Sequence, residues 1–177
     1  MIAPDPPLAD EAVALRPWSA ADVPVIVRCA GDELVARFIP QIPVPYSTAD
    51  AVAYIERTVA DSELNLAITD RAGGEVLGSV GLALKAWDEE MAEIGYWLAP
   101  EARGRGSATR ALRLLSRWAL RELRIARLQL QADAANLASQ AVADRAGFVR
   151  EAVLRNGMAG RDGPRDCVVY SLLPGEG

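Results

Sequence analysis

The 177-residue sequence contains no histidine and only one lysine, Lys85. Without histidine the chain cannot form a Ser-His-Asp triad, a Cys-His dyad or a zinc site with histidine ligands. The nucleotide-binding P-loop ends in Gly-Lys-Ser/Thr, and Lys85 does not stand in such a loop. These absences exclude several of the common hydrolases and the P-loop nucleotidases.

Cysteine and long apolar runs are also scarce. Cys29 and Cys167 share no motif spacing, which predicts a reduced, cytoplasmic environment. Apolar residues make up 51% of the chain, yet no run approaches the ~18 residues of a membrane helix. The first ten residues are acidic and proline-rich, unlike the basic leader of a signal peptide. We expect residues 1–10 to be flexible and residues 1–177 to form one domain.

Charge is unevenly distributed along the chain. Residues 1–100 carry 16 acidic and 6 basic residues, and residues 101–177 carry 8 acidic and 13 basic ones. The C-terminal part therefore suits an anionic cofactor and the N-terminal part a cationic acceptor, although both can equally be solvated faces. The sequence pI of about 4.9 argues against a nucleic-acid partner.

Residues 92–112 organise the chain. An apolar strand ends at Pro100, a loop rich in glycine and arginine follows, and a helix begins near Gly106. The helix is predicted because apolar residues recur at i, i+3 and i+4, with arginines on the opposite side. These apolar residues are Ala108, Ala111, Leu112, Leu115, Trp118 and Ala119.

The loop before this helix has the chemistry of an anion site. Gly104 and Gly106 allow the backbone to approach a ligand, and Arg103 and Arg105 supply bidentate donors. The unpaired N–H groups of a helix start complete a cradle for a phosphate. The dinucleotide fingerprint does not fit, because Thr109 stands where its third glycine or alanine belongs. A surface turn before an exposed basic helix would explain the loop equally simply.

Alternating strands and helices are expected over the rest of the chain. Strands are predicted at 12–16, 64–69, 75–84, 91–98, 127–132, 148–154 and 167–173. Helices are predicted at 19–30, 32–38, 47–60 and 136–146. The proline-rich segment 38–46 is predicted to be a loop, which either recognises an acceptor or packs over the core.

Three motifs resemble a known family. Arg103-x-x-Gly106-x-Ala108 is similar to the Q/R-x-x-G-x-G/A signature of the GNAT acyl-CoA-dependent N-acyltransferases, and the segment 93–98 resembles that family's central strand. Asn136-x-x-Ser139, followed by Gly147-Phe148, resembles the N-x-x-S…G-F segment of the ribosomal-protein N-terminal acetyltransferase (RimJ/RimL-like) branch. The resemblance covers nearly the whole chain.

This resemblance implies a fold and an activity. The fold is a single-domain α/β (α+β) GNAT fold, with a mixed, mostly antiparallel sheet of six to seven strands and helices on both faces. The activity is acetyl transfer from acetyl-CoA to a primary amine of a small molecule or a protein N-terminus, by direct attack in a ternary complex and without metal, nucleic acid or membrane. A monomer or homodimer is expected. The alternatives are a non-catalytic acyl-CoA-binding regulatory module and an acyltransferase that uses another donor such as succinyl-CoA.

The resemblance also suggests catalytic residues. Glu93 is the candidate base, since it is a carboxylate in an otherwise apolar strand, although a solvent-facing strand start is the simpler reading. Ser139 is the candidate acid, because the tyrosine that many relatives carry in this segment is missing between Tyr96 and Tyr170. Asn136 can both cap a helix and bind the pantetheine amide.

The cofactor is expected to bind along the strand end and the following loop. The backbone amides near Leu98 and Ala99 are expected to contact the oxyanion and pantetheine, whereas the Tyr96 and Trp97 side chains are expected to pack in the core. The roles of Arg145 and Asp166 remain open. The expected cofactor-binding residues are Trp97, Leu98, Ala99, Arg103, Gly104, Arg105, Gly106, Ser107, Ala108 and Asn136.

Overall fold

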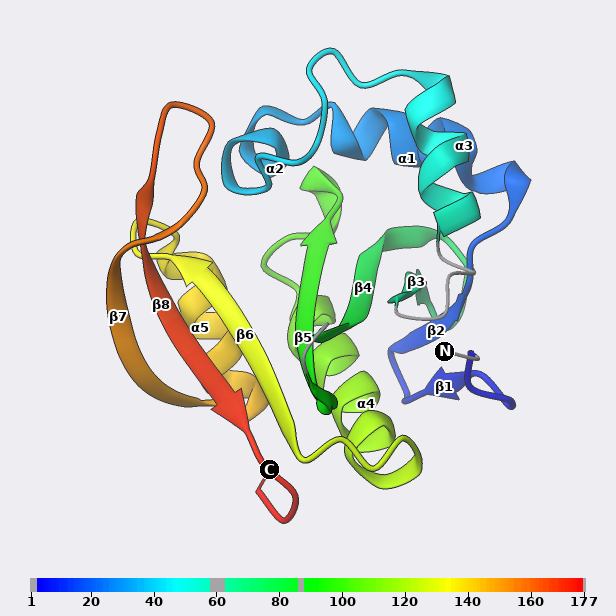
Figure 1. Cartoon of the computed structure of the whole chain (residues 1–177). Helices are drawn as coiled ribbons and strands as arrows, with labels where there is room; N and C mark the ends of the chain where they lie inside the picture. Colours follow the sequence, from blue (N-terminus) through cyan, green and yellow to red (C-terminus); the bar gives the residue numbers. More distant parts are fainter. Residues whose placement is uncertain (1–2, 58–62, 86–87, 177) are drawn as a thin grey trace.

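The computed structural model describes residues 3–57, 63–85 and 88–176 (Figure 1). The strands are β1 (Leu8–Ala9), β2 (Val13–Pro17), β3 (Glu63–Asp70), β4 (Val76–Lys85), β5 (Asp88–Leu98), β6 (Arg127–Asp133), β7 (Val149–Met158) and β8 (Arg165–Leu172). The helices are α1 (Val23–Ala30), α2 (Glu33–Phe38), α3 (Thr48–Arg57), α4 (Ser107–Glu122) and α5 (Leu137–Ala146), with 3-10 turns η1 (Ala20–Asp22) and η2 (Pro100–Ala102).

One mixed sheet forms the centre of the molecule, with the strand order β1-β2-β3-β4-β5-β6-β8-β7. Neighbouring strands are antiparallel, apart from the parallel pair β5 and β6. The predicted class is confirmed, and the sheet has eight strands instead of six to seven. The additional strand is β1, which pairs with β2. β1 lies within residues 1–10, the segment expected to be flexible.

Helices cover both faces of the sheet, as predicted. The apolar stripe of α4 is buried against β5, β4 and β2, where Leu112 and Leu115 join the main core with Ile94. On the opposite face a smaller core lies beneath α1 and α3, around Trp18 and Ile26. Among the described residues, no helix is both long and apolar enough to cross a bilayer.

The sheet opens between β5 and β6. These strands pair only from Met91 to Glu93 on β5 and from Arg127 to Gln129 on β6. Beyond Glu93 they separate, and Figure 1 shows the green and yellow strands diverging toward the top of the view. The second half of β5 therefore keeps β4 as its neighbour and has an open side toward β6.

Candidate active site

Strand alternation gives β5 two different faces. Ile94 is 1% exposed and packs in the core beneath α4, whereas Glu93, Gly95 and Trp97 face the side of α1 and α3. This is the division that alternation predicts from the sequence. The open half of β5 therefore lines two adjoining cavities.

The first cavity, the β5–β6 slot, occupies the gap between the two strands and has a volume of about 610 Å³. It lies between β5, β6, the loop before α4 and the start of α5. Both candidate catalytic residues, Glu93 and Ser139, line it. Six expected cofactor-binding residues also line it: Trp97, Leu98, Arg103, Gly104, Ala108 and Asn136.

The backbone amides at the end of β5 point in opposite directions. The Ala99 N–H donates to Leu77 O on β4 at 2.9 Å, so this amide is not available to an oxyanion. Because successive N–H groups of a strand point to opposite sides, the Leu98 N–H points into the slot. Of the two expected oxyanion donors, Leu98 alone has the required direction.

The loop before α4 has the backbone expected of an anion cradle. Gly104 and Gly106 adopt φ values of 75° and 82°, a left-handed conformation that favours glycine. Gly106 is the N-cap of α4 and brings no side chain to the first turn, whose N–H groups face the loop. Arg105 is exposed, while Ser107 is buried at the first position of the helix.

Arg103 connects this loop to α2. Its guanidinium forms an ion pair with Asp32, the N-cap of α2, and also donates to Leu98 O at 3.3 Å. Burial raises the pKa of Asp32, but the Arg103 hydrogen bond and the N–H of Val35 outweigh it and lower the pKa overall. The arginine of the signature is thus held at the mouth of the slot by α2.

Ser139 and Asn136 lie together at the start of α5. The Asn136 side chain accepts a hydrogen bond from the Ser139 N–H at 3.1 Å, so the predicted helix cap is confirmed. The Ser139 hydroxyl lies near the phenol of Tyr96, and both side chains line the slot. Burial raises the pKa of Tyr96, and the Ser139 contact partly offsets this rise. Tyr96 is therefore a wall of the slot instead of a residue of the closed core.

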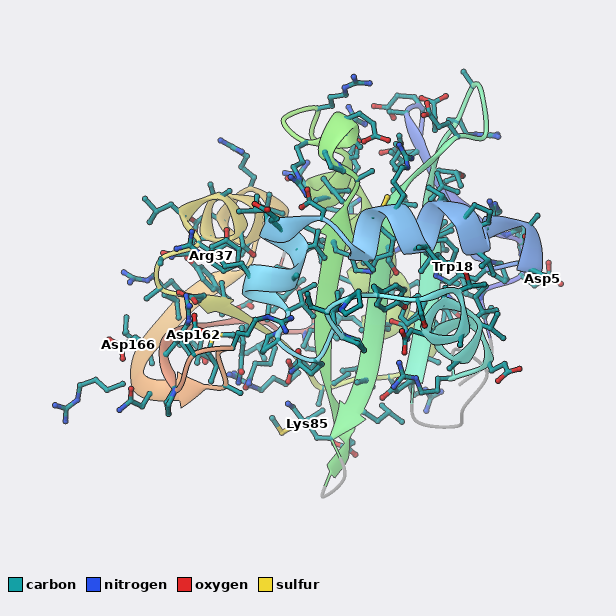
Figure 2. All side chains as sticks on the ribbon, turned by 90° about the horizontal axis from the view of Figure 1, so that it is seen from above. Asp5, Trp18, Arg37, Lys85, Asp162 and Asp166 are labelled. Carbon is teal, nitrogen blue, oxygen red and sulfur yellow. The ribbon has the colours of Figure 1, made fainter. Side chains whose placement is uncertain are left out.

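Glu93 is paired with the single lysine of the chain. The ammonium of Lys85 forms an ion pair with the Glu93 carboxylate across the β4–β5 ladder, and Figure 2 shows Lys85 at one end of these central strands. The Glu93 side chain is 41% exposed. It is thus a solvated carboxylate at the edge of the slot, within reach of both water and a ligand.

The second cavity, the β3–β5 pocket, lies on the face of the sheet that α1 and α3 cover and has a volume of about 440 Å³. Its floor is formed by β3, β4 and β5 and its roof by α1, α3 and the loop that follows α2. The predicted acceptor loop contributes Ile39, Gln41, Ile42, Pro43 and Tyr46. Both cavities are lined by Glu93, Gly95 and Trp97, so they meet on β5.

A family comparison matches this architecture. The family described as Acetyltransferase (GNAT) domain matches residues 13–149, from the start of β2 to the start of β7. The chain belongs to the GNAT acetyltransferase family. The matched segment contains β5, the loop before α4, and α5. It therefore includes every residue that lines both cavities.

Relatives and solved structures agree with this assignment to the GNAT family. YdaF of Bacillus subtilis (strain 168), provisionally named a ribosomal N-acetyltransferase, is 38% identical over 103 residues, which are 58% of this chain and 56% of YdaF. The chain thus spans little more than half of that relative. A structure from T. thermophilus, provisionally described as an acetyltransferase, is 32% identical with a TM-score of 0.81 and covers 98% of this chain and 92% of its own. RimL, a ribosomal L7/L12 alpha-N-protein acetyltransferase solved with coenzyme A, shares the fold at 19% identity, with a TM-score of 0.84 and coverage of 94% and 97%.

The remaining candidate residues of this GNAT protein lie away from both cavities. Arg145 is exposed at the end of α5, where its carbonyl accepts a hydrogen bond from Arg113. Asp166, labelled in Figure 2, is exposed on β8 and accepts a hydrogen bond from the Asn156 N–H at 2.9 Å. Their contacts in the structure are with neighbouring protein groups.

Two residues of the site were not assigned a site role from the sequence. Tyr96 was expected in the core, and Lys85 was noted only as the single lysine. Alternation along β5 places the Tyr96 side chain on the opposite face of the strand from Glu93. Its phenol reaches the slot only because the sheet is open beside β5. The pairing of Lys85 with Glu93 depends on the register of β4 and β5, which the sequence pattern does not specify.

Proposed function

We propose that this chain is an N-acetyltransferase that transfers the acetyl group of acetyl-CoA to a primary amine. The observation that carries this proposal is the meeting of two cavities on β5, at Glu93, Gly95 and Trp97. A thioester entering through the β5–β6 slot and an amine entering through the β3–β5 pocket would meet at the same strand. Direct transfer requires this arrangement, because both substrates must be held together during attack.

The slot offers groups for binding the donor. The α4 loop, with Gly104 and Gly106 in left-handed conformations and Arg103 beside it, would hold the pyrophosphate. The Asn136 amide nitrogen would donate to the pantetheine arm, since its oxygen already caps α5. The Leu98 N–H would stabilise the negative charge that develops on the thioester oxygen.

Proton transfers would occur at both ends of the reaction. Glu93 would remove a proton from the ammonium, directly or through water, so that a neutral amine attacks the thioester carbon. As the carbon–sulfur bond breaks, the departing thiolate would take a proton from Ser139 or from the nearby Tyr96 phenol, both of which line the slot. The products would be an amide and coenzyme A.

Thiol release from acetyl-CoA tests this function directly. The panel should contain peptides that begin with Ala, Ser or Thr, together with amino acid amides, polyamines and aminoglycosides; succinyl-CoA tests the donor. YdaF and RimL carry ribosomal names, so peptide N-termini belong in the first round. Tight acetyl-CoA binding without release for any acceptor would indicate a binding module, and absence of binding would contradict the proposal.

The Glu93→Gln variant tests the base. We expect turnover to fall about 100-fold or more, because general-base catalysis contributes on that scale. The affinity for acetyl-CoA, measured by calorimetry, should change little. Full activity in this variant would remove Glu93 from the mechanism.

A further inference from the structure

The floor of the β3–β5 pocket consists of three rows of residues that run across β3, β4 and β5. These rows indicate which acceptor the proposed reaction would use. Register pairs Glu63 with Ala83 and Ala83 with Glu93, so the first row across the three strands carries two carboxylates. The next row pairs Asn65 with Gly81 and Gly81 with Gly95. The third row pairs Ala67 with Ser79 and Ser79 with Trp97.

The middle row forms a hollow at Gly95. A Cβ atom added at Gly95 would meet no other atom within 4 Å, so this position opens into the cavity. A Cβ atom at Gly81 would lie 2.1 Å from the Asn65 side-chain oxygen, so the Asn65 side chain covers the backbone of Gly81. The open room for a ligand group is therefore above Gly95, beside the Asn65 amide.

Aromatic side chains close one end of the hollow. The Trp97 ring stacks on Trp18 at a centroid distance of 5.9 Å and an interplanar angle of 20°, which fixes its orientation. The Tyr54 hydroxyl lies 2.8 Å from Ser79 Oγ and is thereby satisfied within the protein. Tyr46, whose pKa is raised to about 12 chiefly by burial, lies in the same wall. This end of the pocket favours an apolar or aromatic group.

Carboxylates lie at the other end. Glu93 marks the junction with the slot, and Glu63 is exposed at the rim with Arg57. Since Lys85 pairs with Glu93 and Arg57 adds a second cation, the pocket does not carry a large excess of negative charge. It can hold one ammonium beside Glu93, but a second ammonium on the ligand would face the aromatic wall.

We propose that the β3–β5 pocket selects a primary amine whose neighbouring carbon bears one aromatic or branched apolar group. The nitrogen lies near Glu93 and the apolar group lies over Gly95 against Trp97. The volume of about 440 Å³ is that of a small-molecule site. A free amine and the first residue of a peptide share this chemistry. The inference rests on the proposed function and narrows its acceptor.

Acceptor kinetics test the selection. With saturating acetyl-CoA, kcat/KM should be about 10- to 100-fold higher for phenylalaninamide or leucinamide than for glycinamide, because one buried apolar group discriminates on this scale. Lysinamide should be poorer than leucinamide. If the acceptor is a peptide N-terminus, peptides that begin with Phe or Leu should also react faster than peptides that begin with Gly or Lys. If the acceptor is a free amine, only the amino acid amides should react. Equal or better rates with glycinamide, lysinamide or Ser-peptides would overturn the proposal.

The Gly95→Ala variant tests the hollow itself. Its methyl group enters open space, so folding is preserved, and the ratio of kcat/KM for phenylalaninamide over glycinamide should fall at least several-fold. Gly73→Ala is the matched control, since its Cβ makes only an ordinary 3.6 Å contact in the turn after β3, outside both cavities. An unchanged ratio in Gly95→Ala would overturn the proposal.

A binding experiment separates this inference from the proposed function. Phenylalaninamide, glycinamide and lysinamide are titrated against the full chain, with Trp97→Phe as a variant in the aromatic wall, and affinity is measured by calorimetry. If no acceptor is acetylated but phenylalaninamide binds at least 10-fold more tightly than the other two, the proposed function fails and the pocket inference stands. If acetylation proceeds but the three amines bind equally, the inference fails and the function stands.

Discussion

Ser139 is in contact with a second hydroxyl, that of Tyr96. A phenol with an ordinary pKa near 10 is a far stronger acid than an alkyl hydroxyl. Burial raises the pKa of Tyr96 further, so the phenol stays protonated at neutral pH and can act as a donor. We therefore propose that Tyr96 of β5 takes the role of the tyrosine that the sequence lacks beside Ser139.

The Tyr96→Phe variant is expected to lose turnover about 10- to 100-fold, because general-acid catalysis is worth at least this much when one donor is removed. The KM for acetyl-CoA should stay nearly constant. Tyr170→Phe removes a phenol from the buried β8 core and serves as the control. If Ser139→Ala loses activity and Tyr96→Phe does not, the proton comes from the serine alone.

Arg103 offers a prediction on binding. Replacement by alanine should weaken acetyl-CoA affinity about 10-fold, since a charge-assisted hydrogen bond to phosphate would be lost. Arg117→Ala changes the same charge on the exposed side of α4 and should leave affinity unchanged. Calorimetry at two salt concentrations measures both. An unaltered affinity in Arg103→Ala would mean that Asp32 keeps this guanidinium out of the phosphate site.

At the scale of elements, one carboxylate connects three strands of the C-terminal part of the sheet. The Glu151 carboxylate on β7 accepts hydrogen bonds from the two terminal guanidinium nitrogens of Arg127 on β6. It also accepts one from Ser171 Oγ on β8 at 2.7 Å. The Arg127 hydrogen bond and then the Ser171 hydroxyl lower the pKa of Glu151 to about 2. The charged form is therefore favoured in the folded state.

The Glu151→Gln variant should show a stability loss that depends on pH. Because the folded-state pKa lies below the ordinary value of 4.5, the ionised carboxylate stabilises the fold above that value, and this stabilisation is lost as pH falls toward 2. The pair is partly exposed to solvent, so we expect at most about 1 kcal/mol at pH 7. Thermal melts of both proteins should differ by a few degrees at pH 7 and converge as pH approaches 2. A constant difference across this range would contradict the assignment.

Local sequence signals predicted most elements, and long-range pairing accounts for the differences. Asn136 was predicted as a cap because its partner is only three residues away. A strand was predicted at 91–98, yet β5 already begins at Asp88, since pairing with β4 overrides the polar composition of Asp88–Glu90. β7 likewise extends to Met158, with register shifts that accommodate Asn156 at a φ of 52°. The hollow at Gly95 and the approach of Tyr96 to Ser139 depend on register and packing, which no local pattern contains.

At the scale of the whole molecule, the slot lies between two parts of the sheet that are joined by a short contact. A ligand that binds only the folded state stabilises it by mass action, by about 2.7 kcal/mol at a concentration 100 times Kd. For a chain of this length, acetyl-CoA should therefore raise Tm by roughly 5–11 °C. Differential scanning fluorimetry checks this, with Arg103→Ala expected to shift less at the same concentration. No shift at saturating acetyl-CoA would contradict binding in the slot.

The three-residue contact between β5 and β6 also affects the order of folding. β3, β4 and β5 pair antiparallel and follow one another along the chain, so the β3–β4 and β4–β5 pairings close short loops. The β5–β6 contact is parallel and requires the intervening segment with α4 to cross the sheet first. Loops of greater length cost more entropy to close, so this junction should form after those two pairings. We expect that during synthesis β3, β4 and β5 pair first, and that the slot is assembled only when β6 docks beside β5.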